Sequence, residues 1–206
     1  MPSQKERMLS GQLYKAADPE IRKVNARARK LTRLFNQTTE EQMAYRQELL
    51  KELFGQTGDQ IYIEQPFHID YGAHTTIGNH FYANYDCIFI DTAPITIGAN
   101  VYLAPRVGLY TAGHPIDAAI RNEELEYGYP ITIGDNVWIG GNTVVNPGVT
   151  IGSNVVIGSG SIVVKDIPDN VVAVGNPCKV LRPITQADQD YWQQQKAAYL
   201  ADQDLK

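Results

Sequence analysis

The chain has 206 residues, of which 43% are hydrophobic, and its formal net charge is −5. A chain of this length fits one folded unit with terminal additions. The acidic balance argues against a nucleic-acid-binding protein, because recognition of phosphates requires an excess of Lys and Arg. No segment approaches the roughly 20 apolar residues of a membrane span, so we expect no membrane partner. The two cysteines, Cys87 and Cys178, are too few for a disulfide framework and favour a cytoplasmic setting.

Residues 1–58 are predicted to form an N-terminal helical cap. Ser3 and Glu6 have the spacing of a capping box at the start of a first helix. Asp18 followed by Pro19 suits the start of a second helix, because both residue types favour helix initiation at these positions. In that second helix apolar residues recur at helical spacing, at Ile21, Val24, Ala28, Leu31 and Phe35.

A third helix of the cap is predicted between Thr39 and Gly55. Thr39 and Gln42 offer another capping box, and Gly55 is a suitable helix stop. An apolar stripe along this helix is expected to pack against the domain that follows. Its members are Met43, Leu49, Leu50 and Leu53.

From Ile133 onward an aliphatic residue returns at every sixth position, often with Gly directly after it. This period fits neither an α-helix nor simple strand alternation, and it is typical of the hexapeptide repeat of a parallel β-helix. Three hexads would close one triangular coil, with the aliphatic side chains inside and with Gly, Asn or Asp taking left-handed angles at the corners. We therefore predict an all-β core over residues 59–183. The aliphatic positions are Ile133, Ile139, Val145, Ile151, Ile157 and Val163.

The register of the repeat changes once in the first half of the core. Ile97 lies 36 residues before Ile133, which equals two coils of eighteen. Ile77 lies 20 residues before Ile97, two more than one coil. We therefore expect an irregular corner or bulge between Asp91 and Pro94.

Residues 110–130 break the repeat and are predicted to form a loop that projects from the β-helix. His114, in the sequence TAGHP, lies at the root of this loop. Histidine suits proton transfer near neutral pH, because its unperturbed pKa lies near 6.5. From the residues alone, His114 acts either as a catalytic base or as a cap on the local backbone.

A final helix is predicted over residues 184–206. Thr185 and Asp188 offer its N-terminal signal, and apolar residues follow at Tyr191, Trp192, Tyr199 and Leu200. We expect this helix to act as a lid on the last coil rather than as an independent domain.

Three further histidines, His68, His74 and His80, are spaced by six residues. A step of six moves a side chain to the next face of the β-helix, so these imidazoles cannot converge within one chain. Additional Cys or carboxylate ligands are also absent around them. We therefore predict no metal site and interpret them as surface histidines.

Four short motifs, YANYD, TAGHP, NVWIGG and GNPCKV, together with the cap segment GQLYKAADPE, resemble the maltose and galactoside O-acetyltransferase family of hexapeptide transferases. The resemblance covers roughly residues 5–183. It implies a left-handed parallel β-helix, a homotrimer with active sites between subunits, acetyl-CoA as the donor and a sugar hydroxyl as the acceptor. No metal is implied.

The resemblance also implies roles for individual residues. His114 is the general base that takes the proton of the acceptor hydroxyl. Asn84 contacts the acceptor or the reacting centre, where its amide or backbone N–H groups stabilise the oxyanion; alternatively it is a corner residue with left-handed angles. Asp70 and Asp18 bind the acceptor, although Asp18 is equally suited as a helix N-cap. Glu126 either orients the imidazole of His114, binds the sugar or is an exposed, solvated acid.

The donor site implied by the resemblance lies along the groove between neighbouring β-helices. Small residues there allow the pantetheine arm to approach the backbone, and basic residues near the C-terminal end would balance the nucleotide phosphates. Trp138 is either a wall of this groove or a packing residue. The implied set is Trp138, Gly141, Ser159, Val164, Lys165, Lys179 and Arg182.

The acceptor is less sharply specified than the donor. Thr92 stands where some galactoside-type members carry an acidic acceptor contact. The cap segment and the sequence AGHPID are closer to maltose-type members, so we favour glucose or maltose. The alternatives are a galactoside O-acetyltransferase and a non-catalytic trimeric sugar-binding scaffold.

Overall fold

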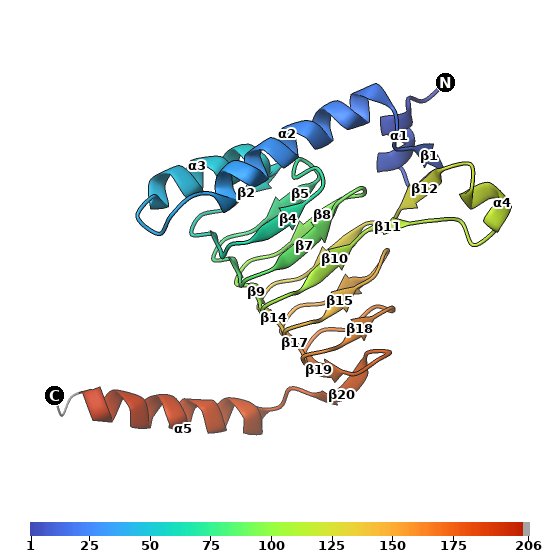
Figure 1. The fold of residues 1–206 in the computed structure, drawn as a ribbon. Helices are drawn as coiled ribbons and strands as arrows, with labels where there is room; N and C mark the ends of the chain where they lie inside the picture. The colour runs from blue at the N-terminus through green and yellow to red at the C-terminus, as the bar shows by residue number, and fades with distance from the viewer. Residues whose placement is uncertain (204–206) are drawn as a thin grey trace.

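The computed structural model describes residues 1–203 and shows a left-handed parallel β-helix that carries helices at both ends (Figure 1). This confirms the predicted fold class. Each coil contributes one strand to each of three faces. Face 1 contains β3 (Tyr62–Ile63), β6 (Tyr82–Ala83), β9 (Tyr102–Leu103), β14 (Val137–Ile139), β17 (Val155–Ile157) and β19 (Val171–Val174), and β20 (Lys179–Pro183) is added antiparallel to β19.

The other two faces are built from parallel strands alone. Face 2 contains β4 (Phe67–Ile69), β7 (Cys87–Ile90), β10 (Gly108–Tyr110), β15 (Val144–Val145) and β18 (Ile162–Val163). Face 3 contains β2 (Gln56–Thr57), β5 (Thr75–Ile77), β8 (Ile95–Ile97), β13 (Ile131–Ile133) and β16 (Thr150–Ile151). The chain passes from face 1 to face 2 to face 3 in every coil.

The aliphatic residues of the hexad form the core. Each of the six from Ile133 to Val163 is at most 1% exposed. Full burial of one such side chain stabilises a fold by about 1.5–3 kcal/mol, so the stacked rows hold the coils together.

At the corners, asparagines take the left-handed backbone angles, and glycines allow the backbones of adjacent coils to approach closely. Asn136, Asn142 and Asn154 take left-handed angles, with φ of 55° to 57°. The glycines that follow the aliphatic residues do not. A Cβ on Gly98 would lie 2.7 Å from the carbonyl carbon of Gly134 in the next coil, which is closer than real contacts allow. The expected left-handed angles are therefore found at asparagines and at a few glycines such as Gly160, whereas the glycines that follow the aliphatic residues instead allow adjacent coils to approach.

The corner between faces 2 and 3 contains the additional residues. Ile77 pairs with Ile97 at an interval of 20, whereas Ile133 pairs with Ile151 at an interval of 18. The two additional residues fall between β7 and β8, where the segment from Asp91 to Pro94 was expected to be irregular. Residues 110–130 leave the β-helix at the same corner one coil later, so all the irregular segments are stacked together.

The projecting loop has secondary structure of its own. It contains β11 (Ala112–Gly113), α4 (Ala118–Arg121) and β12 (Leu125–Gly128). Strand β12 pairs antiparallel with β11 and also with β1 (Tyr14–Lys15) of the cap. The loop is therefore fixed to the N-terminal cap.

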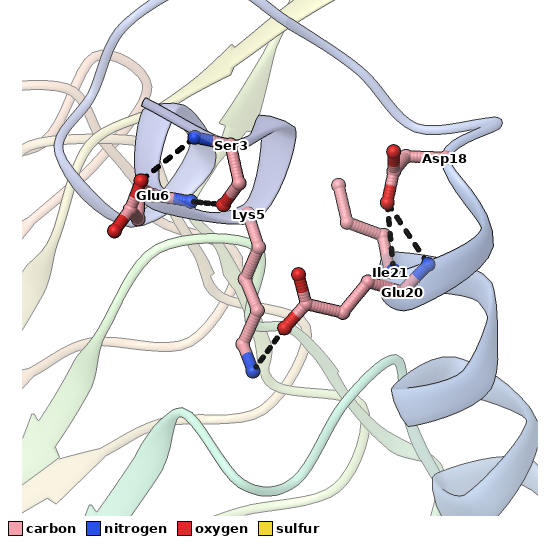
Figure 2. Close-up of polar contacts among 6 residues, drawn as sticks. All are labelled: Ser3, Lys5, Glu6, Asp18, Glu20 and Ile21. Atoms are coloured by element: carbon pink, nitrogen blue, oxygen red, sulfur yellow. Dashed lines mark hydrogen bonds and ion pairs between the residues drawn. The ribbon is translucent and has the colours of Figure 1, made fainter. Parts of the chain in front are cut away.

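The first two helices of the cap begin as the sequence predicts (Figure 2). Ser3 and Glu6 make both hydrogen bonds of the capping box of α1 (Gln4–Leu9). Asp18 accepts the backbone N–H groups of Glu20 and Ile21 at the start of α2 (Pro19–Asn36). An ion pair of 3.1 Å between Lys5 and Glu20 joins the two helices.

The third helix, α3 (Met43–Leu53), differs from the prediction at its start. The backbone N–H of Thr39 donates to the side chain of Gln42, but no side chain caps the helix, so only half of the capping box forms. The apolar stripe buries Leu49, Leu50 and Leu53, whereas Met43 is 39% exposed. Helices α2 and α3 lie across the first coil (Figure 1).

The C-terminal helix α5 (Gln186–Gln203) extends away from the β-helix (Figure 1). Its large apolar residues are 50% to 67% exposed. The prediction that it covers the last coil is therefore wrong; residues 204–206 of the predicted helix lie outside the described residues. Within residues 1–203, no helix is long and apolar enough to cross a membrane.

Candidate active site

A cleft of about 620 Å³ lies where α2, the irregular corner and the projecting loop meet. We call it the His114 cleft. Its wall contains His114, Asp70, Glu126 and Thr92, so three of the predicted site residues converge here within one chain. A second hollow of about 410 Å³, between the loop and the segment after β1, is also lined by His114 and Glu126.

His114 directly follows β11 and is exposed to solvent. Among the described residues, no hydrogen bond occupies its imidazole. The interpretation of His114 as a cap on local backbone therefore has no support in the structure. An imidazole with both nitrogens accessible can accept a proton from a hydroxyl group in the cleft.

Glu126 is fixed by the pairing of the loop with the cap. It lies opposite Tyr14 in the pair of β1 and β12, and the Tyr14 hydroxyl donates a hydrogen bond of 2.8 Å to its carboxylate. Burial, together with this carboxylate, raises the pKa of Tyr14, so the phenol remains a donor at neutral pH. Glu126 is thus a positioned, half-buried acid, which contradicts its interpretation as an exposed, solvated residue.

Asp70 directly follows β4 and lines the His114 cleft. Burial raises the pKa of its carboxyl, and Arg29 across the cleft offsets part of this rise. Asn25 of α2 donates to the Asp70 carbonyl oxygen at 2.9 Å, which leaves the carboxylate available to a ligand. Carboxylates in such positions accept hydrogen bonds from paired sugar hydroxyls.

Asp91 and Thr92 follow Ile90, but the Asp91 side chain is buried in the protein whereas Thr92 lines the cleft. Asp91 is fully buried, and its carboxylate accepts the Tyr71 backbone N–H at 2.8 Å and the Thr75 hydroxyl at 3.0 Å. Burial raises the pKa of Asp91 to about 7. It is therefore a structural acid, and Thr92 is the residue that lines the cleft at this corner.

Asp18 and Asn84 lie apart from these residues. Asp18 caps α2 and does not line the His114 cleft. Asn84 follows β6 at the corner of faces 1 and 2, where Asp86, and not Asn84, has a left-handed φ of 61°. The alternative role of Asn84 as a left-handed corner residue is therefore excluded. Face 2, about 13 Å wide for the four residues of β7, separates Asn84 from the His114 corner.

The predicted donor residues divide into two groups across face 2. Trp138 on β14 is 52% exposed beside Tyr102 of β9, so it is not a packing residue within the coil. Gly141 and Ser159 lie at the corner of faces 1 and 2, where a Cβ on Gly141 would come within 3.1 Å of a backbone oxygen. Val164 and Lys165 lie at the opposite corner, directly after β18.

The two basic residues nearest the C-terminal end, Lys179 and Arg182, lie on the antiparallel strand β20. The two terminal nitrogens of the Arg182 guanidinium, Nη1 and Nη2, donate to Asp188 of α5 at 2.8 and 2.7 Å. Arg182 therefore already has a carboxylate partner, whereas Lys165 and Lys179 are exposed. Among the described residues, ion pairs of these two lysines are absent.

The remaining histidines occupy three unrelated positions. His68 is exposed on β4, and His80 lies at a corner with φ of 56°. His74 is not a surface residue as predicted: it stacks on Tyr71, its Nδ1 lies 2.8 Å from the Asp91 carbonyl oxygen, and burial lowers its pKa. In the part of the chain that the structure describes, no group of three residues could hold a metal ion.

Sequence reasoning missed a polar stripe on α2 that lines the His114 cleft with its first part and a neighbouring hollow with its second. Its members follow one another at intervals of three or four residues, the spacing of one helix face, beside the apolar stripe that the prediction used. That spacing predicts from the sequence that these polar side chains share one face of the helix. The stripe consists of Arg22, Asn25, Arg29, Arg33 and Asn36.

Comparisons with known proteins agree with this arrangement of cap and coils. The maltose acetyltransferase hexapeptide capping motif matches residues 7–58, and the bacterial transferase hexapeptide (six repeats) matches residues 130–165. The structure of a maltose O-acetyltransferase from Clostridium difficile 630 is similar with 55% identity and a TM-score of 0.89, covering 90% of this chain and 99% of that one.

Two further proteins extend the comparison. A galactoside acetyltransferase in complex with coenzyme A is similar with 43% identity and a TM-score of 0.89, over 92% of this chain and 94% of its own. A putative acetyltransferase of Saccharomyces cerevisiae is 47% identical over 89% of this chain and 94% of its own length. The chain belongs to the maltose and galactoside O-acetyltransferase family of hexapeptide-repeat acetyltransferases.

Proposed function

We propose that this protein is an acetyl-CoA-dependent O-acetyltransferase that moves an acetyl group to a hydroxyl of a small sugar of the glucose or maltose type. The observation that carries the proposal is the accessible imidazole of His114 in a cleft that also presents Asp70 and Glu126. The relatives with coenzyme A and maltose in their names support the donor and the acceptor class.

The chemistry is a direct transfer. His114 takes the proton of the sugar hydroxyl as its oxygen attacks the thioester carbonyl, and the tetrahedral intermediate collapses with release of the coenzyme A thiolate, which then receives the proton. A covalent acyl-enzyme on cysteine is not supported. Cys87 and Cys178 are both buried, and burial raises the pKa of the Cys87 thiol to about 11.

The placement of the predicted residues supports a site between subunits. His114 and Val164 lie at one edge of face 2, and Asn84, Gly141 and Trp138 lie at or beyond the other edge. One chain cannot bring both edges to the same reacting centre. In a homotrimer the first edge of one copy meets the second edge of the next, which completes three equivalent sites.

In this arrangement Asn84 of one copy reaches the reacting centre beside His114 of its neighbour, where its amide stabilises the oxyanion. Asp70 and Glu126 accept hydrogen bonds from sugar hydroxyls. Lys165 and Lys179 balance the nucleotide phosphates of the donor. We place the protein in the cytoplasm, where acetyl-CoA is available and both cysteines stay reduced.

The test is release of coenzyme A thiol from acetyl-CoA by purified protein, with glucose, maltose, a β-galactoside or no acceptor. Release that depends on glucose or maltose supports the proposal. Preference for the β-galactoside would reassign the acceptor. No release with any sugar, from a protein that also fails to bind coenzyme A, would favour a non-catalytic sugar-binding scaffold.

A further inference from the structure

A hollow of about 430 Å³ adjoins the His114 cleft further along α2. It lies between α2 and face 2, and it shares Arg29, Asp70 and Ile90 with the His114 cleft. Arg33 lines this hollow and not the cleft, so we call it the Arg33 hollow. The His114 cleft and the Arg33 hollow are therefore neighbouring parts of one surface depression, and His114 lines only the cleft.

The charge of the Arg33 hollow distinguishes it from the cleft. Arg29, Arg33 and His68 contribute to its wall, and Asp70 is the one carboxylate there. Among residues 1–203, neither guanidinium lies within 4.0 Å of a carboxylate oxygen. This arrangement favours an anionic ligand.

Hydrogen bonds join the two sides of the hollow. Asn36 holds α2 against β4 by two hydrogen bonds to the Phe67 backbone, donating to its carbonyl oxygen at 2.8 Å and accepting its N–H at 3.0 Å. This fixes the backbone beside His68, the next residue of β4, relative to α2.

A buried hydroxyl in the same wall lacks a partner. Thr32 is 6% exposed and lines the hollow, and among the described residues its Oγ1 is the one buried side-chain oxygen or nitrogen without a hydrogen bond. A buried hydroxyl without a hydrogen bond costs about 1–3 kcal/mol. Rotation of the Thr32 side chain would let this hydroxyl donate to an anion in the hollow.

We propose that the Arg33 hollow is an anion subsite, so that the preferred acceptor is a sugar that carries a carboxylate or phosphate remote from the acetylated hydroxyl. The proposal rests on the proposed function and specifies its substrate class. Arg29 and Arg33 bind the anion by charge-assisted hydrogen bonds while the accepting hydroxyl lies at His114. A carboxylate and a phosphate share this chemistry.

The test compares steady-state kinetics with acetyl-CoA for glucose, glucuronate and glucose 6-phosphate. In the unaltered protein, we expect the KM of at least one anionic sugar to be about tenfold below that of glucose. The two anionic arms distinguish a carboxylate from a phosphate. Arg33→Gln should raise the KM of the preferred anionic sugar about tenfold and leave kcat and the KM of glucose nearly unchanged.

Lys30→Gln is the matched control, because it removes one positive charge from an exposed position of α2 outside both spaces. Equal KM values for glucose and both anionic sugars would overturn the subsite. So would an Arg33→Gln protein whose KM rises equally for all three sugars.

Calorimetric binding of the same sugars, without acetyl-CoA, separates the two proposals. Tighter binding of an anionic sugar that Arg33→Gln abolishes supports the subsite even if no thiol is released. Thiol release with neutral sugars and no anion preference in binding would retain the transferase and reject the subsite.

Discussion

Tyr14 and Glu126, 112 residues apart in the chain, are joined by a hydrogen bond of 2.8 Å from the phenol to the carboxylate. The bond closes the pair of β1 and β12, and Glu126 lines the same cleft as His114. The helical cap therefore sets the position of an acid contributed by the projecting loop. The cap thus has two roles, because its helices also bury Ala28, Leu31 and Phe35 in the core.

Tyr14→Phe should raise the KM for the sugar acceptor about tenfold. The substitution removes one hydrogen bond to a charged group and retains the buried ring, so Glu126 loses its fixed position and the fold persists. The KM for acetyl-CoA should not change. Steady-state kinetics with both substrates measures the effect, and Tyr45→Phe, on the exposed surface of α3, is the control. An unchanged acceptor KM would reject a positioning role for Tyr14.

His114→Ala should lower turnover by about 10² to 10⁴ and leave the affinity for coenzyme A nearly unchanged. The imidazole is exposed and its removal leaves no buried cavity, so the fold should persist. Thiol release gives kcat, and calorimetry gives coenzyme A affinity. Turnover close to that of the unaltered protein would show that another group acts as the base.

Asp91→Asn should remove a pH dependence of stability. Burial raises the pKa of Asp91 to about 7, whereas an unfolded aspartate titrates near 4. Between these values the folded protein retains a proton that the unfolded chain releases, so the free energy of unfolding falls as pH rises. The slope is at most about 1.4 kcal/mol per pH unit between pH 4 and 7, and this contribution is fully present only below pH 4.

Urea unfolding at pH 5, 6, 7 and 8, at fixed protein concentration, measures this dependence. The decline between pH 5 and 7 should be smaller in Asp91→Asn than in the unaltered protein. Parallel declines in the two proteins would show that Asp91 is ionised in the folded state throughout this range.

Gly98→Ala should destabilise the fold by about 1–3 kcal/mol, because the new Cβ would overlap the Gly134 backbone in the next coil. Gly160→Asn is the matched control. Gly160 has φ of 73°, no atom lies within 4 Å of a Cβ built on it, and Asn142 takes the same corner one coil earlier. Thermal unfolding should show a lower Tm for the first variant and little change for the second. Equal losses would contradict the division of tasks between glycine and asparagine.

The fold could be predicted because its signal is local. Each hexad from Ile133 to Val163 predicts one strand and one corner from its own six residues. The interval from Ile77 to Ile97 likewise predicts two additional residues at one corner. The exposure of α5 could not be predicted. Aromatic residues such as Trp192 indicate an apolar helix surface, but they do not indicate which surface, if any, it covers.

Within the site, His114 was predicted from its place at the root of the loop, and Asp70 and Thr92 were singled out from the family resemblance. Asp70, Thr92 and His114 lie at one corner of successive coils, and the structure brings them to one cleft. Tyr14 was missed because its partner is 112 residues away and a two-residue strand has no periodic signal. The polar stripe on α2, which includes Arg33, was missed because only the apolar face of this helix was considered.

Trp138 should report coenzyme A binding by its fluorescence. The chain has two tryptophans, Trp138 on face 1 and Trp192 on α5, and both are exposed, at 52% and 67%. In Trp192→Phe, Trp138 is the single fluorophore, and a pantetheine arm along the groove would shield its indole from water. Titration with coenzyme A should therefore shift the emission of Trp192→Phe to shorter wavelength. Trp138→Phe, which retains Trp192, should show no shift, and the opposite pattern would move the donor site from face 1 to α5.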